Sequence, residues 1–260
     1  MRIVVLGSGT SNGVPVIGCD CAVCTSPDPR DRRTRPSILV EAGGTTVLVD
    51  TTPEMRLQCV AAGVRSIDAV LYTHEHADHI YGLDDTRVFC ARGRTLPVYG
   101  APRTLDAVER AFGYIFAGGP LTGGGRPSID LRPIHRRCFS IGAISFEVVP
   151  IHHGDLEIHA YRVGAFAYVT DVNRIEPVSR DRLRGLDTLI LGALRDRPHP
   201  THFTIAEALD VIADLAPRRA YLTHLCHEVG HVAVESRLPP GVRLAYDGLA
   251  LEVADAPPFP

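Results

Sequence analysis

Short apolar runs bounded by turn residues recur along the chain, and they predict β-strands that are covered on both faces. In the first half these runs are residues 3–6, 38–40, 47–49 and 69–72. In the second half they are residues 144–149, 158–163, 166–170, 188–191 and 219–223. Strands buried on both faces need a second sheet or helices packed on each side, so the pattern predicts sheets inside a layered fold.

Helical patterns stand between and after these runs. The helical pattern of residues 53–62 starts at the pair Thr51 and Glu54, and that of residues 205–215 starts at the pair Thr204 and Glu207. The two residues of each pair are spaced as in a capping box. Residues 83–91 also predict a helix. Two mixed sheets packed together, with helices outside, would bury both kinds of element. We therefore predict an α/β fold of four layers, in a single domain over residues 1–260.

Composition indicates the cellular compartment expected for this chain. No run reaches the roughly 18 apolar residues of a membrane span, and Met1 to Leu6 lead into Gly7 without a signal-peptide pattern. The seven cysteines are an odd number and unevenly spread, which favours metal binding over a disulfide framework. We therefore expect a soluble, cytoplasmic protein without a membrane partner.

The basic residues exclude some chemistry. All 27 are arginine, so Schiff-base and phosphate-loop lysine mechanisms are excluded. A formal charge of −3 offers no broad basic field for nucleic acid. The cluster Arg30, Arg32, Arg33 and Arg35 is either a solvated loop or a phosphate site. Residues 118–127, rich in glycine and proline, predict a surface loop that could act as a lid.

The strongest chemical signal is the run His74-Glu75-His76-Ala77-Asp78-His79, which directly follows the apolar residues 69–72. Imidazole and carboxylate groups bind divalent metals when they converge on one point. A tight turn leaving a strand lets alternate residues face the same point. His74 and His76 would then serve one metal ion, while Asp78 and His79 serve a second.

This run resembles the signature of the metallo-β-lactamase superfamily, and the resemblance implies that superfamily's αββα sandwich. It also implies further metal ligands at His153, Asp171 and His224, each of which follows an apolar, strand-like run. Asp50 would orient ligand histidines from behind. His152 is the rival of His153, because adjacent residues on a strand point oppositely. His153 is preferred, since the superfamily's histidine directly precedes a small residue, here Gly154.

A second signal is the set of thiols Cys19, Cys21 and Cys24, which need one more ligand to close a tetrahedral zinc site. The whole chain is similar to the phosphoribosyl 1,2-cyclic phosphate phosphodiesterase family of the carbon-phosphorus lyase pathway. That resemblance implies a structural zinc completed by His227. The neighbouring Cys226 remains an alternative fourth ligand.

The same resemblance implies a function. Two divalent ions, zinc or manganese, would serve hydrolysis of a small phosphorylated sugar, such as 5-phosphoribosyl 1,2-cyclic phosphate, in a homodimer. Asp78 would orient the nucleophile, and His202 would give a proton to the leaving sugar oxygen. One alternative is a nuclease that processes the 3′ end of tRNA, for which a basic arm is expected. The other is a non-catalytic or coenzyme-biosynthesis member, for which missing ligands are expected.

Overall fold

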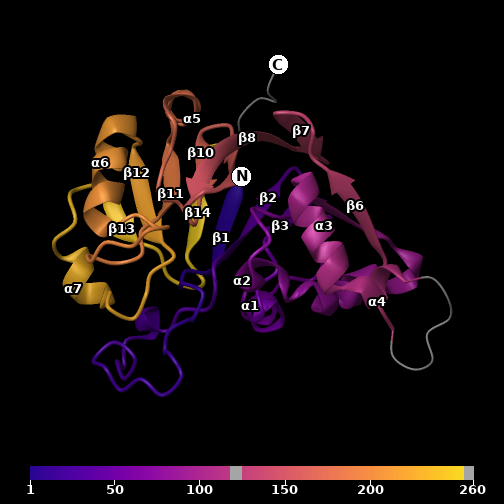
Figure 1. The fold of residues 1–260 in the computed structure, drawn as a ribbon, viewed down its shortest axis with the longest axis horizontal. Helices are drawn as coiled ribbons and strands as arrows, with labels where there is room; N and C mark the ends of the chain where they lie inside the picture. Colours follow the sequence, from indigo (N-terminus) through magenta and orange to yellow (C-terminus); the bar gives the residue numbers. More distant parts are fainter. Residues whose placement is uncertain (118–124, 255–260) are drawn as a thin grey trace.

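The computed structural model describes residues 1–117 and 125–254. Residues 118–124 of the predicted lid therefore lie outside the described residues. Within the described ranges the strands form two seven-stranded sheets, with helices on the outer face of each (Figure 1). The predicted four-layer α/β fold is confirmed.

The first sheet contains the N-terminal strands in the order β14-β1-β2-β3-β4-β5-β6. Their bounds are Arg2–Gly7 (β1), Ser37–Ala42 (β2), Thr45–Val49 (β3), Ala69–Leu71 (β4), Leu96–Gly100 (β5), Ile129–Pro133 (β6) and Ala250–Glu252 (β14). β14 joins the end of the described chain to its beginning, because it pairs antiparallel with β1, where Arg2 lies opposite Glu252.

The second sheet has the order β13-β12-β11-β10-β9-β8-β7. Its strands are Cys138–Ile141 (β7), Ile144–His153 (β8), Leu156–Val163 (β9), Phe166–Val169 (β10), Thr188–Gly192 (β11), Arg219–Thr223 (β12) and Val242–Leu244 (β13). β10 to β13 run parallel, whereas β7 to β10 pair antiparallel. Both sheets are therefore mixed, as predicted.

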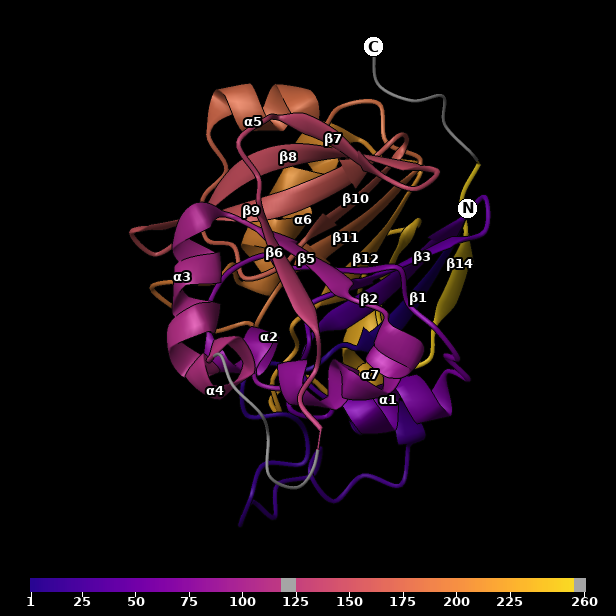
Figure 2. The same ribbon diagram turned by 90° about the vertical axis from the view of Figure 1, so that its right-hand side faces the viewer.

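The helices lie on the outer faces of the two sheets (Figure 2). Beside the first sheet lie α1 (Met55–Ala61), α2 (Ala77–Ile80), α3 (Pro102–Ala111), α4 (Gly113–Phe116) and the 3₁₀ helix η2 (Leu83–Gly93). Beside the second sheet lie α5 (Pro177–Arg182), α6 (Ile205–Leu215) and α7 (His231–Glu235). The short 3₁₀ helix η1 spans Pro29–Asp31 in the N-terminal loop. No helix within the described ranges is long and apolar enough to cross a bilayer.

The period-two alternation of each strand divides the interior into three apolar cores. In β3, Val47 and Val49 point into the core between the sheets, whereas Leu48 packs under the helices beside the first sheet. In β11, Ile190 points into the central core and Leu189 packs under the helices beside the second sheet. The central core binds the two sheets together, so the loops at one edge of both sheets are held close to one another.

The predicted elements are present, with one difference. The capping box from Thr204 to Glu207 opens α6 as expected. The predicted box from Thr51 to Glu54 is wrong: the Thr51 hydroxyl bonds the Tyr72 hydroxyl at 2.7 Å, and α1 begins without a side-chain cap. Residues 83–91, predicted as a helix of unspecified type, lie in the 3₁₀ helix η2.

Candidate metal centre

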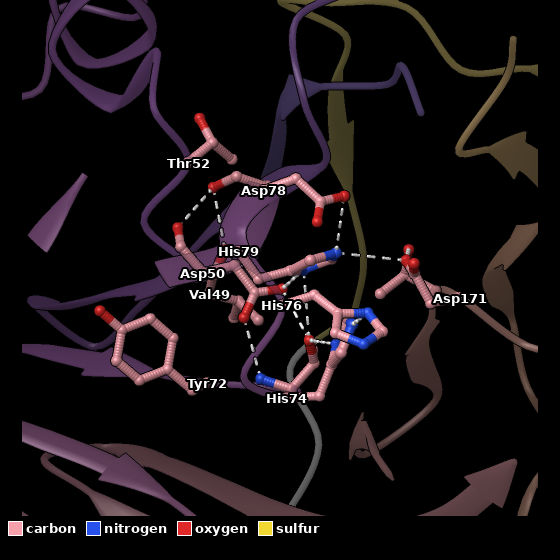
Figure 3. A network of polar contacts seen from close by, with 12 residues as sticks. Val49, Asp50, Thr52, Tyr72, His74, His76, Asp78, His79 and Asp171 are labelled. Carbon is pink, nitrogen blue, oxygen red and sulfur yellow. Dashed lines mark hydrogen bonds and ion pairs between the residues drawn. The ribbon is translucent and has the colours of Figure 1, made fainter. Parts of the chain in front are cut away.

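The predicted metal-binding residues come from the carboxyl ends of strands in both sheets. Residues 73–79 follow β4, His153 ends β8, Asp171 follows β10, and His224 directly follows β12. Figure 3 shows His74, His76, Asp78, His79 and Asp171 converging on one region. Strand ends provide fixed positions for loop side chains, which is the usual way in which a rigid scaffold presents chemistry.

Strained backbone marks this region. Among the described residues other than glycine, four have a positive φ, and three of these are Asp50 (65°), Asp171 (51°) and His224 (62°). The left-handed conformation costs an L-residue about 1–3 kcal/mol, so it persists only where the surroundings enforce it. The strain therefore falls on strand ends whose side chains turn into the centre.

The first candidate ligand group is His74, His76 and His153, which each offer one ring nitrogen within 4.8 Å of the others. His74 Nε2 lies 3.0 Å from His76 Nδ1. His153 Nδ1 lies 2.9 Å from the Thr201 carbonyl oxygen and donates to it, which leaves Nε2 for an ion. His152 is directed elsewhere, with its Nε2 3.7 Å from Glu176. The structure thus brings His153, and not its neighbour, into the group.

The second group is Asp78, His79, Asp171 and His224, all of them buried. His79 Nε2 lies 3.4 Å from carboxylate oxygens of both Asp78 and Asp171. His224 Nε2 lies 3.1 Å from Asp171 Oδ2 and 3.9 Å from Asp78 Oδ2. The seven predicted ligands therefore form two adjacent groups, divided as the spacing of the first four predicted.

Asp50 supports this centre from behind. Its buried carboxylate accepts from the Thr73 amide at 2.9 Å, from the Thr73 hydroxyl at 2.8 Å, and from His79 Nδ1 at 2.8 Å. Because Nδ1 donates to Asp50, the Nε2 atom of His79 faces the other members of the second group (Figure 3).

The donor atoms fit a cation. His79 Nε2 and His224 Nε2 are buried and have no hydrogen-bond partner. An unpaired buried polar atom is costly, and native proteins avoid it unless an ion or a water satisfies the atom. Imidazole nitrogens beside carboxylates are the ligand set of zinc and manganese. The site therefore fits the two divalent ions that the superfamily resemblance implies.

The electrostatics of the second group also favour a bound cation. Burial opposes ionisation of Asp171, but the charges of His224 and His79 outweigh it and hold the pKa of Asp171 well below its usual range. Burial likewise opposes protonation of His224, yet Asp171 raises the pKa of His224 to about 9. Two buried carboxylates thus demand positive charge, which protons supply when no metal does.

His202 lies against both groups. Its ring centroid is 4.7 Å from that of His153 and 4.6 Å from that of His224, on which it stacks. Burial lowers the pKa of His202 to about 3, so the ring is neutral without ions or substrate. Its nitrogen lies within 4.8 Å of donor atoms of His153 and Asp171, so the ring is close enough to act as a ligand as well.

The thiols form a separate cluster on the N-terminal loop. His227 Nδ1 lies 3.2 Å from the sulfur of Cys19 and 3.6 Å from the sulfurs of Cys21 and Cys24. These four donors fit the tetrahedral set of a structural zinc. Cys226 is directed away, and its sulfur accepts from the Glu228 amide at 3.4 Å. The structure brings His227 to the three thiols, and not the alternative Cys226.

The arginine cluster matches neither expectation as a whole. Arg33 is buried, where it pairs with Asp31 at 2.7 Å and donates to the Cys226 carbonyl oxygen at 3.3 Å. Arg30 pairs with Asp28 at 2.8 Å, and Arg35 pairs with Glu54. Three of the four arginines therefore brace the N-terminal loop, because carboxylates close in sequence and in space neutralise them.

Two curated relatives match most of this chain. The chain is 39% identical over 253 residues to an octanoyltransferase of Porphyromonas gingivalis, covering 96% of this chain and 51% of that protein. It is 33% identical over 195 residues to a ribonuclease Z of Bradyrhizobium sp., covering 72% of this chain and 58% of that protein. The chain thus spans just over half the length of these two curated relatives.

Solved structures include a diphosphatase from the PhnP family, with a TM-score of 0.91, 43% identity, and 98% of both chains covered. Zn²⁺-bound PqqB from Methylobacterium extorquens shares the fold at 20% identity and a TM-score of 0.75, over 97% of this chain and 100% of that one. The family model described as the beta-lactamase superfamily domain matches residues 45–225, which hold all seven predicted active-centre ligands. The chain therefore belongs to the beta-lactamase superfamily.

Proposed function

We propose that this chain is a metal-dependent phosphodiesterase that hydrolyses a small cyclic phosphodiester, such as 5-phosphoribosyl 1,2-cyclic phosphate. The observation that carries the proposal is the pair of adjacent ligand groups, one of three histidines and one of two aspartates and two histidines, with His202 against both. The likeness to a PhnP-family diphosphatase over 98% of the chain supports phosphoryl chemistry.

The ligand groups would hold two divalent ions, zinc or manganese, which supply a water-derived nucleophile at neutral pH and neutralise charge on the phosphoryl group. The chain's own residues set the geometry. Asp50 fixes the His79 ring, and the Thr201 carbonyl oxygen fixes the His153 ring. Asp78, buried between His79 and His224, is placed to orient the attacking water as well as to bind an ion.

His202 is our proposed proton donor to the leaving sugar oxygen. Its ring is neutral when the site holds no substrate, because burial depresses its pKa. A phosphate anion beside the ring would favour the protonated form, which is the form that can donate. The stacked contact with His224 keeps the ring at the edge of the ligand groups.

The proposal also covers the thiol cluster, the domain organisation, the location and the oligomeric state. Cys19, Cys21, Cys24 and His227 would hold a structural zinc, for which their mutual distances are suited. From the chain length and composition we further propose a single domain and a cytoplasmic location. The family resemblance implies a homodimer. Size-exclusion chromatography with light scattering tests the dimer.

A nuclease acting on tRNA 3′ ends is the second candidate, because ribonuclease Z matches 72% of this chain. The formal charge of −3 and the neutralised arginines of the N-terminal loop argue against a broad RNA-binding surface.

A metal-replete screen over ribosyl cyclic phosphates, bis-p-nitrophenyl phosphate and precursor tRNA tests the proposal. We expect efficient turnover of a cyclic phosphate and slow turnover of the nitrophenyl ester. Faster cleavage of precursor tRNA than of any small ester would establish the second candidate instead. No turnover of any substrate by the metal-loaded chain would contradict both.

A further inference from the structure

A polar pocket lies between the metal centre and the thiol cluster. It has a volume of about 190 Å³, and its walls include His202 on one side and Cys226 and His227 on the other. This volume is well above the roughly 10–15 Å³ that a single water needs, so a phosphate group fits. Because His202 also touches His153 and His224, the pocket opens beside the reaction centre.

The lining of this pocket suits an anion. Its polar side chains are hydrogen-bond donors: Thr10, Ser11, Asn12, Arg195, His199 and His202. Among the described residues that line it, none is a carboxylate. Hydroxyl, amide, imidazole and guanidinium groups are the usual ligands of a phosphate oxygen.

Arg195 has a hydrogen-bond donor that no protein group satisfies. Its Nη1 atom donates to Glu228 at 2.8 Å, but its Nε atom is buried and has no hydrogen-bond partner. Glu228 also accepts from Arg197 at 2.6 and 2.9 Å, so a single carboxylate faces two guanidinium groups. One positive charge therefore remains, and Glu228 holds Arg195 at the pocket wall without neutralising the pair.

A second pocket beside the centre is less suited to an anion. It has a volume of about 580 Å³ and is lined by His76 and His153, with Asp155 and Arg174 among its other residues. Arg174 is 54% exposed and pairs with Glu176 at 2.9 Å. A carboxylate in the lining and an arginine that is already paired both disfavour a second anion there.

We infer that the pocket of Arg195 binds a phosphate monoester at the non-reacting end of the substrate, while the cyclic phosphate reacts at the metal centre. This inference rests on the proposed function and adds the part of the site that selects a phosphorylated sugar over an unphosphorylated one. Asn12, Ser11 and His199 supply further donors to the same phosphate.

The thiol cluster braces this pocket. The Val16 amide, in the loop that forms one wall, donates to the Cys24 sulfur at 3.3 Å. Behind the opposite wall, buried Arg33 donates to the Cys226 carbonyl oxygen at 3.3 Å. The cluster thus links a distant loop to the pocket, and its four donors, if they held a zinc ion, would fix the Val16 wall of the pocket.

The test compares two substrates in the metal-loaded chain: 5-phosphoribosyl 1,2-cyclic phosphate and the same cyclic phosphate without the 5-phosphate. Losing a charge-assisted hydrogen bond to phosphate weakens binding by roughly 10- to 100-fold. Arg195→Met should therefore raise KM by about that factor for the phosphorylated substrate and change the other substrate little. Arg195→Lys should restore part of the loss, since it restores the charge.

Two arginines serve as controls. Arg197→Met removes a guanidinium from the same Glu228, but this side chain is 68% exposed and is absent from the pocket lining. Arg174→Met alters the second pocket and should leave the preference between the two substrates unchanged. Arg197→Met lowers the net charge beside Glu228 but removes no donor from the pocket lining, so it should reduce that preference less than Arg195→Met does. In calorimetric titration with ribose 5-phosphate, which has no phosphodiester bond to cleave, the largest loss of affinity should occur in Arg195→Met.

Three outcomes would overturn the inference. The first is a wild-type chain that hydrolyses both substrates with equal kcat/KM. The second is an Arg195→Met chain that loses both activities equally, which would make this arginine structural. The third is a loss of preference in Arg174→Met, which would move the phosphate to the other pocket. If neither cyclic phosphate is hydrolysed at all, the proposed function fails instead.

Discussion

The histidine centre and the thiol cluster are two candidate metal sites built in opposite ways. The centre takes its residues from strand ends of both sheets, so its side chains are spread over residues 74–224 and held by the central core. The cluster takes three thiols from one short loop and one imidazole from residue 227. A site on strand ends can be strained and left open for chemistry, whereas three donors on a loop and a fourth from a distant segment would close around an ion and fix the loop.

The two sites also differ in charge. The second ligand group of the centre buries two carboxylates, which hold protons on His79 and His224 when no ion is bound. In the cluster, the amide of Cys24 and its other hydrogen bonds lower the pKa of Cys21 to about 6, while burial raises the pKa of Cys24 to about 11. The fixed charges of the centre thus favour cations, whereas the cluster would have to lose thiol protons to bind zinc.

The largest expected effect is a loss of turnover at the histidine centre that leaves the thiol cluster unchanged. His76→Ala removes an exposed ligand of the first group, so turnover should fall to background because the nucleophile is no longer generated. Of about three metal ions per chain, the zinc of the cluster should remain. Elemental analysis and steady-state kinetics measure both results. His152→Ala is the matched control, since that ring faces Glu176 and should leave turnover intact.

His202 lies between the two sites and tests chemistry apart from metal binding. His202→Ala should lower turnover of a sugar phosphodiester by about 10²- to 10⁴-fold, the usual value of general acid catalysis. A p-nitrophenyl ester should lose much less, because p-nitrophenolate leaves without a proton. Equal losses with unchanged metal content would make His202 a positioning residue, and a loss of one ion would make it a ligand.

The thiol cluster should affect stability more than chemistry. Cys21→Ser should remove about one zinc ion per chain and lower the free energy of unfolding by about 4 kcal/mol when free zinc is a thousandfold above its dissociation constant. Chemical denaturation with elemental analysis provides the measurement. Cys226→Ser should keep the ion, because its sulfur faces the Glu228 amide. Loss of zinc from that control would show that Cys226 is the fourth ligand.

The smallest effect concerns the support of the centre. Asp50→Asn places an amide NH₂ against either the Thr73 amide or His79 Nδ1, both of which are donors in the structure. We expect metal affinity at the centre to fall by about 10- to 100-fold. Competition with a chelator measures it. Asp247→Asn changes a similarly buried carboxylate, bound to Ser8 and Thr34, and should leave that affinity unchanged.

Local patterns predicted most of the fold. The apolar runs and the capping box at Thr204 identified the central strands and α6, because burial on both faces and a side-chain cap leave marks in adjacent residues. The edge strands β13 and β14, of three residues each, gave no such pattern. Their pairing depends on partners far along the chain, such as Arg2 opposite Glu252.

Candidate metal-binding residues could be predicted from the sequence where they lie close together along the chain. The run from His74 to His79 and the three thiols within six residues predicted metal sites by residue type and spacing alone, and the family resemblance added the distant candidate ligands. The preference for His153 over His152 depends on the direction of two side chains on β8, which the sequence does not give. In the structure His153 lies with the ligand group and contacts Thr201, whereas His152 faces Glu176.

What the tertiary structure alone decided is the space between the two sites. The pocket of Arg195 is lined by residues from the N-terminal loop, from the segment after β11, and from the segment after β12. In the sequence, Arg33 could equally have been solvated or bound to phosphate, and only packing showed it buried against Asp31. Ligand type and local spacing are properties of neighbouring residues, whereas a pocket and a neutralised charge depend on which distant segments the packed sheets bring together.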